Sequence, residues 1–164
     1  MPFIAHSYTP DITVVCDDTF ASPALRTPLA LGADLLVHSA TKYLNGHGDV
    51  IAGFVVGSAE FCTQVRMFGL KDMTGAVMDP FTSFLILRGL KTLEIRMQKH
   101  CANAKAVAEF LYNHPAVEKV YYPGLIDHPG HDIARRQMSD FGGMLSFEVK
   151  GGREAGAKLV NALH

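Results

Sequence analysis

The chain has 164 residues, of which 48% are hydrophobic, and this is sufficient for one or two globular domains with a buried core. Fifteen basic and sixteen acidic residues leave a formal charge of -1 without a run of lysine or arginine, so no binding to nucleic acid or membranes is expected. No signal peptide is recognisable, and no apolar stretch reaches the roughly 18 residues that cross a bilayer. Three separated cysteines without CxxC spacing fit a reducing compartment, and we expect a soluble, cytoplasmic protein.

The first two thirds of the chain alternates between short apolar runs and helical patterns. Such alternation is typical of an α/β fold with a mostly parallel sheet. In chain order, the sequence predicts a strand over 13–16, a short helix over 23–31, strands over 35–37 and 51–56, a helix over 59–68, a loop over 69–80 and a long helical stretch over 81–113. Gly89 is expected to bend or divide the long helical stretch, because glycine is a weak helix former.

The composition changes after His114 and Pro115, where we expect a second domain to begin. This part predicts strands over 117–122 and 144–149, a helix over 132–138 and a final helical segment. The chain is therefore divided into residues 1–113 and 114–164. The final helix shows no recognisable cap and the second part has only two evident strands, so we expect an α+β domain that is cut short.

The segment Ser39-Ala40-Thr41-Lys42 follows an apolar strand and precedes a glycine-containing loop. A lysine at the mouth of a buried strand can form a Schiff base with a carbonyl cofactor, because partial desolvation disfavours its charged form. The hydroxyls of Ser39 and Thr41 suit a phosphate group. Asp17, at the end of the preceding strand, suits a pyridinium nitrogen that needs a counter-charge. From residue types alone, a solvated lysine beside a hydroxyl-rich turn is an equally good interpretation.

Further motifs follow in order over residues 12–163. They are Val37-His38-Ser39-Ala40-Thr41-Lys42-Tyr43, Arg88-Gly89-Leu90-Lys91-Thr92-Leu93, Arg96-Met97, His100, Asn103-Ala104, Tyr122-Pro123-Gly124-Leu125 and Gly142-Gly143-Met144. Together with Asp17 they resemble the Cys/Met metabolism family of pyridoxal-phosphate (PLP) enzymes. The resemblance implies the PLP-dependent transferase fold type I, with the C-terminal part of the large PLP-binding domain in residues 1–113 and the beginning of the small C-terminal domain in 114–164.

The same resemblance implies a role for each candidate site residue. Lys42 would bind pyridoxal 5'-phosphate covalently and act as the catalytic base. Ser39 and Thr41 would bind its phosphate, and Asp17 would pair with its ring nitrogen. The family usually has asparagine where this chain has Asp18, and the second carboxylate would either raise the pKa of Asp17 by repulsion or point to solvent.

Residues 69–75, Gly-Leu-Lys-Asp-Met-Thr-Gly, resemble methionine gamma-lyases more than the cystathionine enzymes. This implies α,γ-elimination of L-methionine to methanethiol, 2-oxobutanoate and ammonia by a homo-oligomer, a dimer of dimers. Lys71 and Asp72, in a flexible loop, would recognise the substrate near its sulfur, although an exposed ion pair of little value is an equal alternative. Cystathionine gamma-lyase or synthase and O-acetylhomoserine sulfhydrylase are alternative activities.

Family members are longer than this chain, with an upstream aromatic that stacks on the cofactor ring and a downstream arginine that binds the substrate carboxylate. A truncated, non-catalytic fragment that binds only subunits or cofactor is therefore a hypothesis of another class. Arg88 and Arg96, on the predicted long helix, are expected to have structural roles. The segment His128-Pro129-Gly130-His131 is interpreted as a turn, and no metal site is expected.

Overall fold

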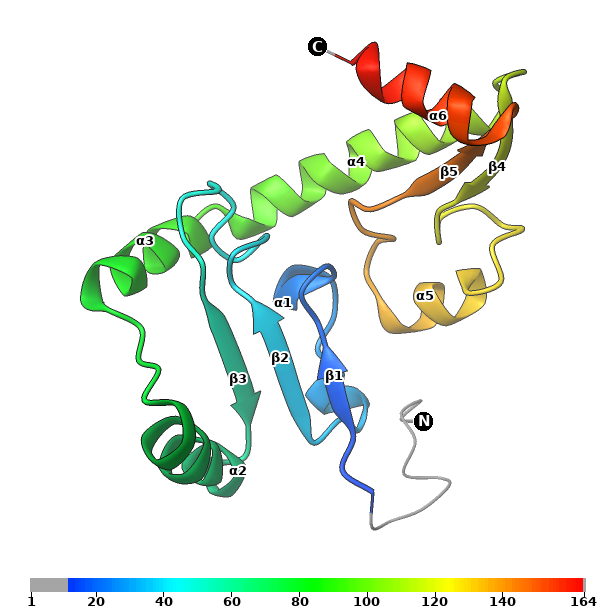
Figure 1. The fold of residues 1–164 in the computed structure, drawn as a ribbon. Helices are drawn as coiled ribbons and strands as arrows, with labels where there is room; N and C mark the ends of the chain where they lie inside the picture. The colour runs from blue at the N-terminus through cyan, green and yellow to red at the C-terminus, as the bar shows by residue number, and fades with distance from the viewer. Residues whose placement is uncertain (1–11, 164) are drawn as a thin grey trace. The chain divides into compact units, whose positions relative to one another are not determined.

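A computed structural model of the chain describes residues 12–163 (Figure 1). The chain divides into two compact units, Met1–Met97 and Gln98–His164. The division falls inside a long helix, whereas the domain boundary predicted after residue 113 follows that helix. The outer ends of the two predicted domains, residues 1–11 and 164, lie outside the described residues. The assignment of these domains to those of the enzyme family stays a prediction.

A three-stranded mixed sheet forms the centre of the first unit. Its strands are β1 (Val15–Asp17), β2 (Leu35–Ser39) and β3 (Gly53–Gly57), side by side in that order (Figure 1). β1 and β2 are parallel, with Asp17 opposite Val37, while β2 and β3 are antiparallel. The described strands therefore do not form the mostly parallel sheet that the sequence predicted. The reason is that a loop without a crossover helix joins β2 to β3, and such a connection returns the chain in the opposite direction.

The connection from β1 to β2 contains two short helices instead of the single helix predicted over 23–31. These are α1 (Ser22–Leu25) and the 3-10 helix η1 (Pro28–Leu31). Pro28 separates them, because its ring excludes the preceding residue from the helical region. Thr27 accordingly has φ -127° and ψ 82°.

The segment after β3 is helical for longer than the sequence predicted. α2 (Ala59–Gln64) continues directly into a π-helix, η2 (Val65–Thr74). The loop predicted from residue 69 therefore begins only at Gly75, which has a left-handed φ of 64°. A single glycine such as Gly69 weakens a helix without ending it. The wide turn is closed by a 2.6 Å hydrogen bond from the Gly75 N–H to the Leu70 carbonyl, five residues earlier.

The long helical stretch is divided near Gly89, as predicted, into α3 (Pro80–Leu90) and α4 (Leu93–Tyr112). Gly89 also marks a close approach to the loop that follows β2. A Cβ at this position would lie 2.2 Å from the backbone oxygen of Asn45, so only glycine fits without a shift of the backbone. The close packing of α3 on this loop therefore requires glycine at position 89.

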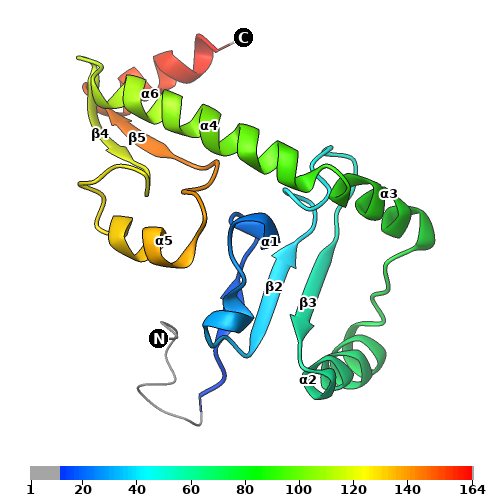
Figure 2. The ribbon, with the colours of Figure 1, turned by 180° about the vertical axis from the view of Figure 1, so that it is seen from behind.

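A two-stranded antiparallel sheet with helices forms the second unit. β4 (Val117–Tyr121) pairs with β5 (Ser146–Val149), and α6 (Gly152–Asn161) contacts β5 (Figure 2). α5 (His131–Gln137) lies in the connection between the strands, so the two strands and two helices predicted for this part are confirmed. Within residues 12–163, no helix is both long enough and apolar enough to cross a bilayer. The core cluster of this unit consists of Ala104, Ala108, Val120 and Tyr122.

Candidate functional site

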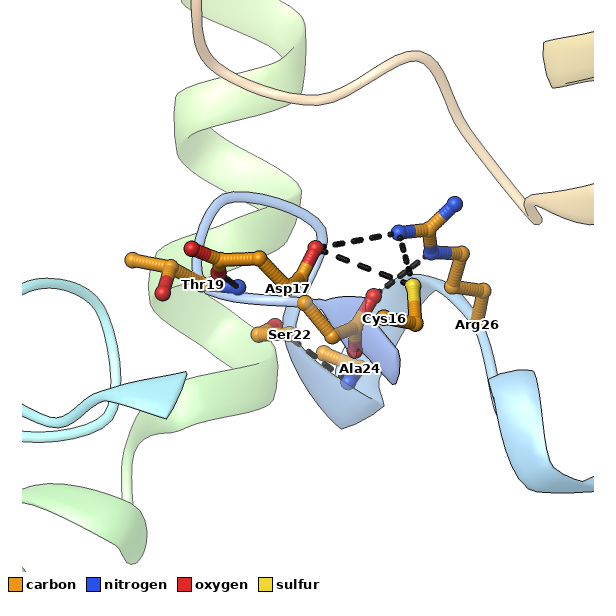
Figure 3. Close-up of polar contacts among 7 residues, drawn as sticks. Cys16, Asp17, Thr19, Ser22, Ala24 and Arg26 are labelled. Carbon is orange, nitrogen blue, oxygen red and sulfur yellow. Dashed lines mark hydrogen bonds and ion pairs between the residues drawn. The ribbon is translucent and has the colours of Figure 1, made fainter. Parts of the chain in front are cut away.

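Asp17 is the last residue of β1, and its side chain is exposed at the edge of the sheet. Its Oδ1 accepts a 2.9 Å hydrogen bond from the backbone N–H of Thr19 (Figure 3). Hydrogen bonds from the hydroxyl and the N–H of Thr19 lower the pKa of Asp17, and the Coulombic influence of His38 acts in the same direction. Asp17 is therefore held in the ionised form, which is the form that pairs with a protonated ring nitrogen.

Thr19 connects Asp17 to the end of β2. Its side chain is buried, and its Oγ1 accepts a 2.8 Å hydrogen bond from the backbone N–H of Ser39. One hydroxyl thus joins the two strand ends that carry candidate cofactor-binding residues. No role for Thr19 was predicted from the sequence. The signal that could have found it is a hydroxyl two residues beyond a carboxylate at a strand end.

A tight turn follows Asp17 and ends at Ser22. Among residues 12–163, Ser22 is the one non-glycine residue with a positive φ, 60°, and it is fully buried. Its N–H donates to the Asp18 carbonyl at 2.9 Å, and its Oγ accepts from the Ala24 N–H at 3.3 Å (Figure 3). Strained backbone of this kind persists only where the surrounding structure determines it. The turn that positions Thr19 is therefore fixed by tertiary contacts.

Asp18 is paired with Arg26 and does not act on Asp17 as a repelling charge. The Asp18 side chain is 1% exposed, and its Oδ1 lies 2.5 Å from Arg26 Nε. Arg26 Nη2 also lies 3.3 Å from Cys16 Sγ and 3.4 Å from the Asp17 carbonyl oxygen (Figure 3). The pKa of Asp17 is lowered by its hydrogen bonds from Thr19, and the increase by repulsion from Asp18 that the sequence left open does not occur.

The segment with Lys42 leaves β2 in a turn, in which the Lys42 N–H donates to the Ser39 carbonyl at 3.2 Å. The Lys42 side chain is exposed, so the described residues do not desolvate its amine as the sequence analysis expected. The Ser39 hydroxyl has no hydrogen-bond partner within residues 12–163. Thr41 Oγ1 is engaged with Ala52: it accepts from the N–H at 3.1 Å and lies 3.4 Å from the carbonyl oxygen. Of the two hydroxyls, that of Ser39 is therefore the one without a hydrogen bond among the described residues.

Arg96 fixes the loop after Lys42 to the start of α4 and the end of α3. Its Nη1 donates to the Tyr43 carbonyl and its Nη2 to the Gly89 carbonyl, both at 2.9 Å. Its Nε donates to Thr92 Oγ1 at 3.1 Å. A structural role of Arg96 on the helix was predicted from the sequence, but its contact with the loop was not.

Lys71 and Asp72 lie on the π-helix η2 and not in a flexible loop. Lys71 Nζ is 3.5 Å from Asp72 Oδ1, and both side chains are more than half exposed, so the ion pair contributes little to stability. No hydrogen bond or ion pair among the described residues joins them to Asp17 or Lys42. Their role in substrate recognition stays a prediction.

The model of the Cys/Met metabolism PLP-dependent enzyme family matches residues 3–164. The chain belongs to this family. An L-methionine gamma-lyase of Fusobacterium nucleatum subsp. nucleatum is 61% identical over 98% of the chain, and a cystathionine gamma-synthase of Mycobacterium tuberculosis is 54% identical over 89%. The chain spans 40% of the length of the first relative and 37% of the second.

The fold agrees with that of solved enzymes of the Cys/Met metabolism family. A crystal structure of cystathionine gamma synthase from Xanthomonas oryzae pv. oryzae, in complex with aminoacrylate and cysteine, superposes with a TM-score of 0.89 at 48% sequence identity. The match covers 94% of this chain and 40% of that chain. The structural neighbours are PLP enzymes of fold type I, so the fold class is confirmed at this level.

The described residues fit PLP, the cofactor of the Cys/Met metabolism family. The carboxyl ends of the parallel strands β1 and β2 meet at one edge of the sheet, which is where ligands bind in sheets of this kind. This edge and the turn beyond it provide the ionised Asp17, the hydroxyl of Ser39 and the exposed amine of Lys42. A carboxylate, a hydroxyl and an amine are the groups that the ring nitrogen, phosphate and aldehyde of PLP require.

Proposed function

We propose that this chain carries the lysine-bearing part of a PLP-dependent carbon–sulfur lyase that converts L-methionine and water to methanethiol, 2-oxobutanoate and ammonia. The observation that carries the proposal is the sheet edge at which Asp17 and Ser39 end neighbouring parallel strands, with Lys42 in the turn that follows Ser39. The choice of reaction is supported by the 61% identity to an L-methionine gamma-lyase. We further propose that residues 1–113 and 114–164 are parts of the large and small domains, in a homo-oligomeric dimer of dimers.

Each residue at this edge has its own chemical task. PLP supplies an electron sink that stabilises negative charge at the α-carbon of the substrate. The ionised Asp17 would stabilise the positive charge on the ring nitrogen, and the hydrogen bonds that lower the pKa of its carboxyl favour this ionised form. Ser39, assisted by Thr41, holds the phosphate by directed hydrogen bonds and so orients the ring.

Lys42 has two tasks in the proposed reaction. Its Nζ holds the cofactor before the substrate arrives. It would then accept the proton from the substrate α-carbon and return that proton to the cofactor-bound substrate, which restores the neutral amine. Because the thiol leaves from the γ-carbon, the amine would next accept a proton from the β-carbon and give it to the departing thiolate. A single amine next to both carbons suffices for these transfers. The exposure of Lys42 in the described residues leaves its side chain accessible to cofactor and substrate.

A chimera provides the test of the proposed function. Residues 12–163 replace the matching segment of the Fusobacterium nucleatum L-methionine gamma-lyase, and the product is incubated with PLP and L-methionine. We expect methanethiol and 2-oxobutanoate, and we expect borohydride reduction followed by peptide mass spectrometry to place the pyridoxyl group on Lys42. Lys42→Ala should reduce turnover by at least about 10²-fold, whereas Lys91→Ala, which removes another exposed amine, should not. A pyridoxyl group on another lysine would contradict the proposal.

A second chimera distinguishes the possible substrates. The 54% identity to a cystathionine gamma-synthase makes cystathionine chemistry the second candidate function. The same segment is therefore also placed in the Mycobacterium tuberculosis enzyme, and both chimeras receive L-methionine, L-cystathionine and O-acetyl-L-homoserine. If both prefer cystathionine or the homoserine ester, the segment belongs to the alternative activities. Cofactor binding without turnover in both chimeras would support the non-catalytic hypothesis.

A further inference from the structure

The guanidinium of Arg96 lies between two segments that are distant in sequence. On one side it donates to the carbonyl of Tyr43, in the loop after Lys42, and on the other to the carbonyl of Gly89, near the end of α3. The third acceptor is the hydroxyl of Thr92. All three acceptors are uncharged. The side chain therefore serves here to join backbone carbonyls at fixed positions, a task for which the planar guanidinium is well suited.

The loop is shaped to receive this guanidinium. Gly46 has a left-handed φ of 74°, and a Cβ on it would lie 2.1 Å from Arg96 Nη1. The Gly46 N–H donates to the Lys42 carbonyl at 2.8 Å, so the peptide groups on both sides of Tyr43 have defined partners. Because Tyr43 follows Lys42 directly, an anchored Tyr43 carbonyl restricts the backbone from which the Lys42 side chain projects.

The opposite side of the loop is equally close to α3. Asn45 is 1% exposed, its Nδ2 donates to Asp49 Oδ1 at 2.7 Å, and its backbone oxygen occupies the space that a side chain at Gly89 would need. The loop therefore touches α3 at Asn45 and is joined to it through Arg96 at Tyr43. Two contacts, at Tyr43 and at Asn45, restrict rotation of the loop about either one.

We propose that Arg96 is a positioning residue for Lys42: by joining the Tyr43 and Gly89 carbonyls it holds the loop, and with it the Lys42 amine, at the edge of the sheet. The role of Lys42 in this proposal rests on the proposed function, whereas the hydrogen bonds by which Arg96 holds the loop do not. The two parts can therefore fail separately.

Hydrogen exchange of the cofactor-free chimera tests the coupling to the loop. Arg96→Lys retains the charge but cannot reach three acceptors, and Arg96→Ala removes all three contacts. We expect amides in peptides covering residues 41–49 to exchange about tenfold faster or more, which corresponds to the loss of ~1.4 kcal/mol. Peptides covering 131–137 should be unchanged. Arg88→Lys is the matched control, because Arg88 is exposed on α3. Unchanged exchange of 41–49 in both Arg96 variants would overturn the proposal.

Kinetics of the loaded chimera test the consequence for Lys42. We expect Arg96→Lys to lower kcat for L-methionine by about 10–100-fold with KM nearly unchanged, and to slow the fixation of PLP on Lys42. Faster loop exchange with an unaltered kcat and fixation rate would refute the positioning of Lys42. If the unsubstituted chimera shows no turnover, the proposed function fails, and the exchange experiment still decides whether Arg96 holds the loop.

Discussion

Replacement of Gly89 by alanine tests the close packing of α3 on the loop after β2. In an open helix this substitution would be favourable by about 1 kcal/mol. Here the new Cβ would lie 2.2 Å from the Asn45 oxygen, 2.9 Å from its carbonyl carbon and 3.0 Å from its Cα. Because all three are backbone atoms and ordinary contacts begin at 3.4 Å, α3 would have to move by roughly 1 Å.

The expected cost has two contributions. Overpacking of this kind costs ~1–3 kcal/mol, which already offsets the gain in helix propensity. The movement also lengthens the hydrogen bond from Arg96 to the Gly89 carbonyl, and a bond from a charged donor is worth ~1.5–3 kcal/mol. We expect Gly89→Ala to lower the free energy of unfolding by about 2–4 kcal/mol.

Urea unfolding followed by far-UV circular dichroism measures this difference. The matched control is Gly156→Ala in α6, where a new Cβ meets nothing within 4 Å. The control should raise the free energy of unfolding by about 0.5–1 kcal/mol. If Gly89→Ala stabilised the protein as the control does, the described contact between α3 and the Asn45 backbone would be refuted.

Three further predictions concern the strand ends. Thr19→Val leaves the Ser39 N–H without its acceptor and Asp17 without a hydroxyl donor, so PLP affinity of the chimera, measured by titration, should fall about tenfold; Thr19→Ser should retain it. The pKa of Asp17 in the folded protein lies below its usual 3.8, so the ionised carboxyl stabilises the folded state above pH 3.8. This contribution is lost only as the pH falls through the lower folded pKa. A carbon-13 NMR titration that shows protonation of Asp17 near about pH 5 would contradict this prediction. Arg26→Met leaves the buried Asp18 uncompensated and should cost ~3 kcal/mol in urea unfolding, and adding Asp18→Asn should recover part of this loss; strictly additive losses would exclude the coupling.

The order of the elements could be predicted because apolar runs, glycines and prolines are local signals. The break at Pro28 is also a local effect and could have been read from the sequence. The direction of β3 could not be, because an apolar strand has the same pattern in either orientation. The extension of η2 beyond Gly69 depends on a change of hydrogen-bonding pattern that hydrophobic periodicity does not report.

The chemical groups of the candidate site could be predicted from the sequence, but the hydrogen bonds that connect them could not. Lys42 and Asp17 could be selected because they lie within motifs that resemble those of the Cys/Met metabolism family, whereas their residue types alone are equally compatible with solvated strand ends. The contacts that organise them join residues far apart in the chain: Thr19 and Ser39 are 20 residues apart, and Arg96 and Tyr43 are 53 apart. Such pairs follow from strand register and helix packing, which only the fold determines.

If Thr41 assists in phosphate binding as proposed above, its hydrogen bonds determine how its hydroxyl would bind the anion. A hydroxyl has one hydrogen and two lone pairs. The N–H of Ala52 occupies a lone pair at 3.1 Å and so anchors the oxygen, while the hydroxyl hydrogen points to the Ala52 carbonyl over a longer 3.4 Å contact. Rotation about the single C–O bond turns that hydrogen to an arriving anion without releasing the anchor. The oxygen of Thr41 would therefore stay in place while its hydroxyl hydrogen reorients. Only the 3.4 Å contact with the Ala52 carbonyl would be lost when an anion binds.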